Sequence, residues 1–333
     1  MAFLQLNGVT INVGEGASNS IRTTGASETN IGGGHYQDIR YRKRTWTFTT
    51  TPYTEMEALA YAGLIRGEGQ LFTMDDTSTS TKNVEAVSDI PTYSTTVPTG
   101  FSGKSLIHGS GTDCNYPVEI FKAQQDLTFN VWTDTAAATG ADEFLVNIYK
   151  TNFYQNSFRV YRTSSDNYLN FAVSAIDSSG DSDKQSILRI SDPFDGSFKM
   201  VTAVLRRNRE SDESTQYLYI NGVVQSVGDT TAAYTPDPSS WTDFKLGKYP
   251  LDAANKWPDR LDDVQVLPYA APASMILGWY NFGQNSGQHP NLKMTGDITN
   301  DSLVTVRGEV ESVSYTFVGG RTRQQISFTL TEV

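Results

Sequence analysis

The chain has 333 residues, with 26 Lys and Arg against 37 Asp and Glu, a formal net charge of −11 and 38% hydrophobic residues. This composition is typical of a globular protein with two or three domains, and an acidic chain argues against nucleic-acid binding, which needs a basic face. The single cysteine, Cys114, excludes an intramolecular disulfide and any zinc or iron–sulfur site built on cysteines.

The first residues predict a β-hairpin. Residues 3–7 and 9–13 alternate apolar and polar positions, and Asn7-Gly8 between them tolerates the positive φ of a tight turn. Residues 1–8 lack the basic start and apolar centre of a signal peptide, and no apolar run reaches the ~20 residues that span a bilayer. We therefore expect synthesis in a cytoplasm and no membrane insertion.

Residues 36–41 and 44–49 predict two further strands, and the second alternates threonine with aromatic residues. Alternation places Arg40, Arg42 and Arg44 on one face. Because unpaired guanidinium groups are not buried, we expect this face to meet solvent or a subunit interface. Nucleic-acid binding is the alternative, and the negative net charge disfavours it.

One helix is expected after Pro52. Thr54-Glu-Met-Glu57 has the spacing of a capping box, residues 58–65 are mostly apolar, and Gly67 supplies a stop. Residues 70–74 predict a short strand. The helix and strand follow the arginine-bearing strand without a long loop.

This stretch resembles the N-terminal domain of bacteriophage tail proteins of the distal-tail and baseplate type. The likeness rests on residues 42–50 (Arg-Lys-Arg-Thr-Trp-Thr-Phe-Thr-Thr), 57–59, 64–69 and 72–76, and it covers roughly residues 40–76. It implies a virion structural protein located in the tail, which assembles with itself into a ring, a hexamer by the resemblance. It also implies contacts with tail tube and hub proteins, and no catalysis.

Two turn-rich segments, residues 76–82 and 283–290, separate an acidic middle from the flanks. The closing segments 303–307, 310–317 and 324–330 alternate like strands, with Gly319-Gly320 as a hairpin turn. They are too few to form a core alone. We therefore predict a split β domain of residues 1–82 and 289–333, with residues 83–288 inserted into it.

The insert resembles the laminin-G or concanavalin A-like sandwich. Many short strands with frequent turn residues independently indicate two packed antiparallel sheets, so the predicted fold class is all-β, with an inserted jelly-roll sandwich. The resemblance rests on the segments 101–107, 127–132, 199–205, 217–225, 244–247, 261–267 and 273–280.

The sequence offers no catalytic arrangement. Related glucanases need two carboxyl groups close together, and no strand carries such a pair. The acidic groups at Asp181 and Asp183, and at Glu210, Asp212 and Glu213, lie in polar turn sequence. We expect a protein that is not an enzyme.

The sequence predicts no cofactor, and a calcium ion is the alternative. Asp177, Asp181 and Asp183 bring several oxygens to one polar loop, and Ca²⁺ takes six to eight. The alternative is a solvated hairpin tip, which needs the same Ser, Gly and Asp residues.

Carbohydrate contact is assigned to aromatic residues, because an exposed ring stacks on the apolar face of a sugar. Trp241 and Trp257 flank proline-containing loops, and Tyr154 lies in an aromatic cluster. The alternative for Tyr154 is an ordinary core position.

Three functions remain open. The first is a phage distal-tail or baseplate protein whose inserted lectin-like domain either binds host polysaccharide during adsorption or only stiffens the outer surface of the tail. The second is a carbohydrate-binding tail-fibre or virion decoration protein. The third is a polysaccharide hydrolase, which the missing carboxylate pair disfavours.

Overall fold

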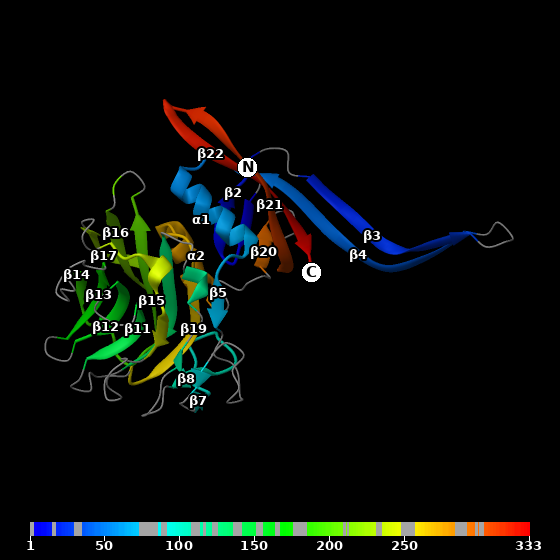
Figure 1. Cartoon of the computed structure of the whole chain (residues 1–333). Coiled ribbons are helices and arrows are strands. Elements are labelled where there is room, and N and C mark those ends of the chain that lie inside the picture. Colours follow the sequence, from blue (N-terminus) through cyan, green and yellow to red (C-terminus); the bar gives the residue numbers. More distant parts are fainter. Residues whose placement is uncertain are drawn as a thin grey trace. The chain divides into compact units, whose positions relative to one another are not determined.

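The computed structural model describes residues 3–14, 18–29, 35–72, 86–87, 92–107, 114–115, 118–121, 126–135, 142–150, 156–163, 167–175, 185–208, 211, 213–230, 235–247, 257–283, 292–296, 299 and 303–333. Within these ranges the protein is all-β, with three antiparallel sheets and two α-helices (Figure 1). The predicted fold class is confirmed. The chain divides into two compact units: a flanking unit of residues 1–68 and 287–333, and a central unit of residues 69–286.

The flanking unit is built on one sheet to which both ends of the chain contribute. The predicted turns at Asn7-Gly8 and Gly319-Gly320 are confirmed, and all four residues have positive φ. The strands lie in the order β2 (Val9–Asn12), β1 (Phe3–Leu6), β20 (Leu292–Gly296), β21 (Val304–Val318), β22 (Arg321–Glu332), β4 (His35–Thr49) and β3 (Ser18–Thr29).

Helix α1 (Glu55–Arg66) begins as the sequence predicts. The Thr54 hydroxyl accepts a hydrogen bond from the Glu57 backbone N–H, and the Glu57 carboxylate accepts from the Thr54 N–H, which completes the capping box. Gly67 ends the helix with φ of 65°. The last turn packs so closely on β21 that a Cβ at Gly308 would lie 2.1 Å from the Ile65 carbonyl oxygen.

The core of the flanking unit lies on one face of this sheet. Ile326, Phe328 and Leu330 alternate along β22 and are fully buried. Phe48 on β4 pairs with Phe328, and their rings stack with centroids 5.2 Å apart. Burying each large side chain contributes roughly 1.5–3 kcal/mol, so this alternation fixes the register of the strands.

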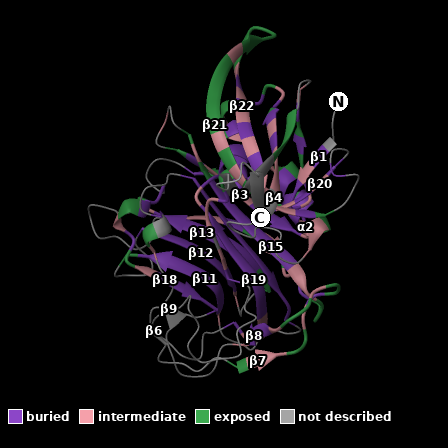
Figure 2. Ribbon diagram, turned by 90° about the vertical axis from the view of Figure 1, so that its right-hand side faces the viewer, coloured by how far each residue is buried: buried purple, intermediate pink, exposed green. Residues whose placement is uncertain are grey.

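The central unit is a sandwich of the other two sheets. The first sheet has the order β17 (Val223–Thr230), β16 (Ser214–Ile220), β15 (Lys199–Arg207), β10 (Leu127–Thr133), β19 (Arg260–Leu267), β8 (Ser105–Ile107) and β7 (Thr92–Ser94), with β5 (Gln70–Phe72) also paired to β19. The second has the order β14 (Gln185–Ser191), β13 (Tyr168–Ser174), β12 (Ser157–Arg162), β11 (Glu143–Tyr149), β18 (Asp243–Leu246), β9 (Cys114–Asn115) and β6 (Ala86–Val87). Figure 2 shows that most of these strands are buried along their length.

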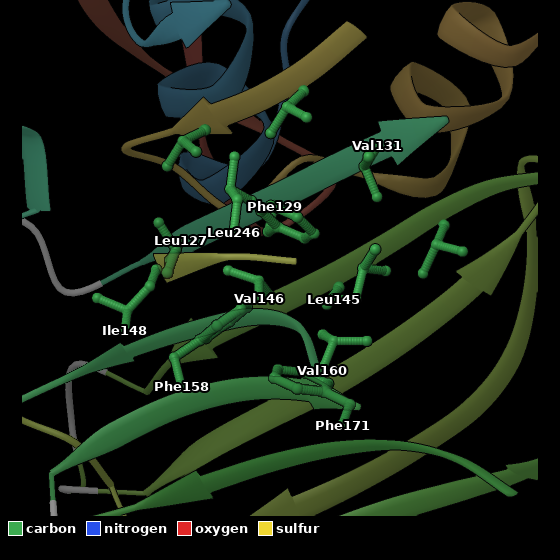
Figure 3. Close-up of a cluster of buried hydrophobic side chains, with 14 of the residues drawn as sticks. Leu127, Phe129, Val131, Leu145, Val146, Ile148, Phe158, Val160, Phe171 and Leu246 are labelled. Atoms are coloured by element: carbon green, nitrogen blue, oxygen red, sulfur yellow. The ribbon is translucent and has the colours of Figure 1, made fainter. Parts of the chain in front are cut away.

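Side chains from both sheets fill the space between them. Figure 3 shows Phe129 and Val131 of β10 directed toward Val146 of β11 and Val160 of β12. All four are fully buried in one apolar cluster. Residues 128, 130 and 132 of β10 therefore point to the opposite, outer face of the first sheet.

Two features of the central unit differ from the sequence analysis. Helix α2 (Ala273–Phe282) was not predicted, and it begins after Pro272 without a side-chain cap. Strand β5, which the sequence placed with the flanking domain, pairs with β19 in the first sheet of the sandwich. Among the described residues, no helix is long and apolar enough to cross a membrane.

Candidate functional site

A pocket of about 680 Å³ lies in the central unit, where the end of β10 meets the start of β19. Its other walls come from residues 96–101, from the turn that precedes β15, and from the C-terminal end of α2. Segments that are far apart in the sequence thus meet at one end of the first sheet. The aromatic and charged residues that line the pocket are Phe101, Trp132, Asp134, Phe198, Arg260, Tyr280 and Phe282.

Trp132 forms the aromatic base of the site. It is the last outward-facing residue of β10, and it is buried although it lies outside the sandwich core. Its ring stacks on Tyr280 of α2 with centroids 5.7 Å apart and planes 15° apart, and Phe101 meets it edge to face at 5.0 Å. The indole N–H of Trp132 has no hydrogen-bond partner in the part of the chain that the structure describes. Tyr280 and Phe101 remain half-buried and face the pocket.

A charged pair stands beside these rings. Arg260 Nη2 lies 2.6 Å from Asp134 Oδ2, and Arg260 Nε donates to both carboxylate oxygens at 3.1 and 2.9 Å. The hydrogen bond to Asp134 raises the pKa of Arg260, so the guanidinium stays charged. The guanidinium carbon lies 5.9 Å from the centre of the Phe198 ring, a cation–π contact. Arg260 Nη1 has no hydrogen-bond partner within the described ranges, so it can donate to a ligand.

The turn before β15 holds Phe198 in place. The Asp195 carboxylate accepts hydrogen bonds from the backbone N–H and the hydroxyl of Ser197, and from Lys199 Nζ. These bonds, those from Ser197 first, lower the pKa of Asp195. The Gly196 N–H donates to the Thr135 carbonyl oxygen at 3.0 Å, which ties the turn to the end of β10.

A buried polar layer supports Asp134 from behind. Trp257 Nε1 donates to Thr133 Oγ1 at 2.7 Å, and Arg162 Nη2 donates to Thr135 Oγ1 at 3.2 Å. Arg162 also forms an ion pair with Glu143, and both side chains are fully buried. Residues 133 and 135 are therefore held on both sides of Asp134, which fixes the carboxylate before any ligand arrives.

The prediction that Trp241 and Trp257 present exposed rings is wrong. Both side chains are fully buried. Trp241 packs edge to face on Phe121 and donates its indole N–H to the Asn156 carbonyl oxygen. Trp257 packs on Phe194 and supports Thr133, as described above. Because both rings are buried, neither can stack on a ligand.

The other predicted ligand residues lie outside the described residues. These are Tyr154, proposed for carbohydrate contact, and Asp177, Asp181 and Asp183, proposed for calcium. Within the described ranges, no group of three or more His, Cys, Asp and Glu side chains is arranged to hold a metal ion.

The three arginines predicted on an assembly face lie on β4, and the side chains of Arg40 and Arg42 are outside the described set. Arg44 has a partner in its own chain. Its Nε and Nη2 donate to the two carboxylate oxygens of Glu332, each at 3.0 Å. This pair raises the pKa of Arg44 and lowers that of Glu332. Arg44 is therefore not an unpaired cation awaiting a neighbouring subunit.

Sequence reasoning missed the pocket residues, although one signal was present. Thr128 and Asn130 are the polar positions of β10, and Trp132 continues their side of the strand. An aromatic residue on the polar side of a core strand indicates a covered or ligand-binding outer face. Asp134 and Arg260 gave no such signal, because only the pairing of β10 with β19 brings them together.

The arrangement suits a small ligand with both apolar and hydroxylated surfaces. The half-buried rings of Tyr280 and Phe198 offer apolar contact, while Asp134 accepts and Arg260 donates hydrogen bonds. Among the described residues that line the pocket, Asp134 is the only carboxylate.

Several solved structures are similar to parts of this chain. The carbohydrate-binding module CBM40 of a Ruminococcus gnavus sialidase, solved with alpha2,3 sialyllactose, is 14% identical, with 50% of this chain and 91% of that chain covered and a TM-score of 0.37. A heptameric SAP-like pentraxin from Limulus polyphemus is 13% identical, with 46% and 69% covered and a TM-score of 0.34. The receptor-binding domain of botulinum neurotoxin type G is 9% identical, with 77% and 60% covered and a TM-score of 0.40.

No curated protein matches the chain. A family model does match, over residues 108–277, and it describes the concanavalin A-like lectin/glucanases superfamily. Trp132, Asp134, Phe198 and Arg260 lie inside the matched segment, whereas Phe101 and Tyr280 lie outside it. The matched segment is more than half of the chain and contains most of the described sandwich. This chain therefore belongs to the concanavalin A-like lectin/glucanases superfamily.

Proposed function

We propose that this protein binds carbohydrate in the pocket between β10, β19 and α2, and that it does not cleave it. One observation carries the proposal: the Trp132–Tyr280 stack and the Asp134–Arg260 pair line the same pocket. Sugar rings have an apolar face for stacking and hydroxyls that both donate and accept hydrogen bonds. The aromatic rings of the pocket can contact the apolar face of a sugar, and Asp134 and Arg260 can form hydrogen bonds with its hydroxyls.

The choice between binding and hydrolysis rests on the carboxylates. Glycoside hydrolysis by the usual mechanism needs two carboxyl groups, about 5–5.5 Å apart for retention and about 6.5–9.5 Å apart for inversion. Among the described lining residues only Asp134 carries a carboxyl group, and Arg260 engages both of its oxygens. Such a carboxylate is held in place as a hydrogen-bond acceptor.

The test is glycan binding by the full chain. Wild type, Phe198→Ala and Val223→Ser would be screened on a glycan array, and the best glycan titrated by calorimetry. Val223 is an exposed residue of β17 outside the pocket and serves as the control. We expect binding by wild type and the control, and about tenfold weaker binding by Phe198→Ala. Binding that Phe198→Ala leaves unchanged would contradict the site, and released oligosaccharides would contradict the non-catalytic role.

We further propose that the protein is a structural component of a phage tail, in the distal-tail or baseplate ring. The resemblance of residues 40–76 to tail proteins supports this. So does the flanking sheet, in which strands from both ends of the chain pair with one another. In a ring, several copies of a weak site would raise avidity for host polysaccharide by roughly 10²–10⁴. A tail-fibre or virion decoration protein is the alternative.

Electron microscopy of the purified protein separates these two roles. A closed ring of several copies would support the tail-ring role. A protein that stays monomeric at all concentrations would contradict the tail-ring role. Glycan binding by the central unit is tested independently by the titration above.

A further inference from the structure

The β21–β22 hairpin extends beyond the part of the flanking sheet that pairs with β4. Strand β4 pairs with β22 at residues 327–331, whereas β21 and β22 continue to pair out to Val318 and Arg321. We call residues 313–323 the distal ribbon. Figure 1 shows β21 and β22 as a long two-stranded ribbon, and Figure 2 shows exposed residues along it.

The apolar side of the distal ribbon continues the core face of the sheet. Val310 pairs with Phe328, and Val313 pairs with Ile326, both of which are core residues. The register shifts at Glu311, and this bulge keeps Val310 and Val313 on the same side of the strand. Tyr315 and Phe317 follow on that side by alternation.

No other described residue covers the apolar side of the distal ribbon at Tyr315 and Phe317. Tyr315 is 73% exposed and Phe317 is 75% exposed, the highest values among the large apolar residues described. Two neighbouring aromatic rings at this exposure indicate a contact surface, because a monomer gains nothing by keeping them in water.

The backbone edge of β21 is also open. Strand β20 pairs with β21 only at residues 304–306, so within the described residues the outer edge of the distal ribbon has no strand beside it. Residues 312–318 read Ser-Val-Ser-Tyr-Thr-Phe-Val and carry no charge. Natural edge strands usually carry lysine, proline or inward charges that prevent pairing, and this edge has none of these.

We propose that the distal ribbon pairs edge to edge with the distal ribbon of a second copy of this chain, with the two β21 strands antiparallel. A two-fold axis at Tyr315 places Tyr315 opposite its equivalent and Val313 opposite Phe317 of the other copy. All these side chains then lie on one face of a four-stranded ribbon, as pairs of the aromatic and β-branched kinds that stabilise sheets.

The charges favour a second copy as the occupant. Glu311 precedes the uncharged run on β21, and Arg321 lies just beyond the turn on β22, both exposed. Antiparallel pairing brings Glu311 of one copy beside the tip of the other, where Arg321 lies. The charges of the two copies are therefore complementary at both ends of the contact, where Glu311 of each copy meets Arg321 of the other. A two-fold contact uses the same surface on both copies and therefore ends at a dimer. A ring needs a head-to-tail contact between two different surfaces, so the ribbon contact is separate from the contact that would build a tail ring.

Sedimentation velocity of the full chain tests the proposal, between about 1 and about 100 µM. The monomer mass is 36.7 kDa. We expect wild type to shift toward twice this mass as concentration rises, and Tyr315→Ser/Phe317→Ser to raise the dimer Kd by at least about tenfold. The control is Val223→Ser/Val227→Ser, which removes two exposed valines from the edge strand β17 of the other unit. The control should dimerise like wild type.

A charge exchange tests the antiparallel geometry. Glu311→Lys should weaken the dimer several-fold, and Glu311→Lys/Arg321→Glu should restore it. Glu311 also accepts a hydrogen bond from Thr329 of its own chain, but Arg321→Glu cannot restore that bond, so rescue reports on the contact between copies. A wild type that stays monomeric throughout, or a Tyr315→Ser/Phe317→Ser variant that dimerises like wild type, would overturn the proposal.

Discussion

Trp132 of β10 and Tyr280 of α2 stack with their ring planes 15° apart, and this contact joins the first sheet of the sandwich to the end of its covering helix. Gly283, directly after α2, has φ of 81°, and a Cβ there would lie 3.3 Å from the Phe101 ring. The end of α2 is thus fitted closely against the aromatic base of the pocket. The shape of the pocket depends on the helix as well as on the strands.

Two replacements of Tyr280 should distinguish the contribution of its ring to glycan binding from that of its hydroxyl. Tyr280→Ala removes the half-buried ring and should weaken glycan binding by about tenfold. Tyr280→Phe keeps the stack on Trp132 and should bind within about threefold of wild type. Calorimetric titration of both variants with the glycan chosen on the array measures this. Equal loss in both variants would assign the contact to the hydroxyl.

Arg260→Lys should weaken binding because lysine cannot reproduce the forked contact with Asp134 while also donating to a ligand. We expect at least about a fivefold loss of affinity. Arg206→Lys, the same change at an exposed position of β15, is the matched control and should bind like wild type. Titration of both variants under the same salt conditions compares them directly.

Local signals in the sequence predicted much of the fold. The capping box at Thr54, the turns at Asn7-Gly8 and Gly319-Gly320, and the alternating strands all appear where short-range rules place them. The turn at Asn221-Gly222 joins β16 to β17 in the same way. These features depend on residues that are close together in the sequence, so they can be predicted from a single sequence.

The site could not be predicted by the same rules. Asp134 and Arg260 meet because β10 and β19 are neighbours in the sheet, a fact of topology that no local pattern carries. Trp241 and Trp257 misled the prediction because proline-rich flanks indicate loops, while the depth of a ring below a loop depends on distant packing partners such as Phe121 and Phe194.

Trp257 should matter for stability more than for direct contact. Trp257→Phe removes the hydrogen bond to Thr133 Oγ1 and leaves a small cavity, and we expect a loss of about 2 kcal/mol in the free energy of unfolding. Urea unfolding measures it. Saturating glycan should still bind to the folded variant, since the ring does not face the pocket. A complete loss of binding by a folded, stable variant would assign Trp257 a direct role.

The Arg44–Glu332 pair predicts a dependence of stability on acid pH. The hydrogen bond from Arg44 lowers the folded-state pKa of Glu332 below its ordinary value of 4.5. The pair therefore stabilises the fold above about pH 4.5, and this contribution is lost as the pH falls through the lowered folded-state pKa. The melting-temperature difference between wild type and Glu332→Gln should be small at pH 7, because the pair is partly exposed, and should shrink toward zero as the pH falls through the lowered folded-state pKa of Glu332. A difference that grows as the pH falls would contradict the pairing.

The buried ion pair behind the pocket should link stability to binding. Glu143 and Arg162 are fully buried, and Arg162 also reaches Asp192 and the Thr135 hydroxyl beside Asp134. Glu143→Gln keeps the size of the side chain but removes the charge that balances Arg162, so we expect a loss of about 3 kcal/mol in the free energy of unfolding. Because the guanidinium would then be drawn toward Asp192, the Thr135 contact should loosen and glycan affinity should fall although no ligand-facing atom has changed. Arg162→Met with Glu143→Leu removes both charges at once; it should recover most of the stability but not the binding, since Thr135 then has no donor. Urea unfolding and titration of the two variants separate these effects, and full binding by the double variant would show that the ion pair supports the fold alone.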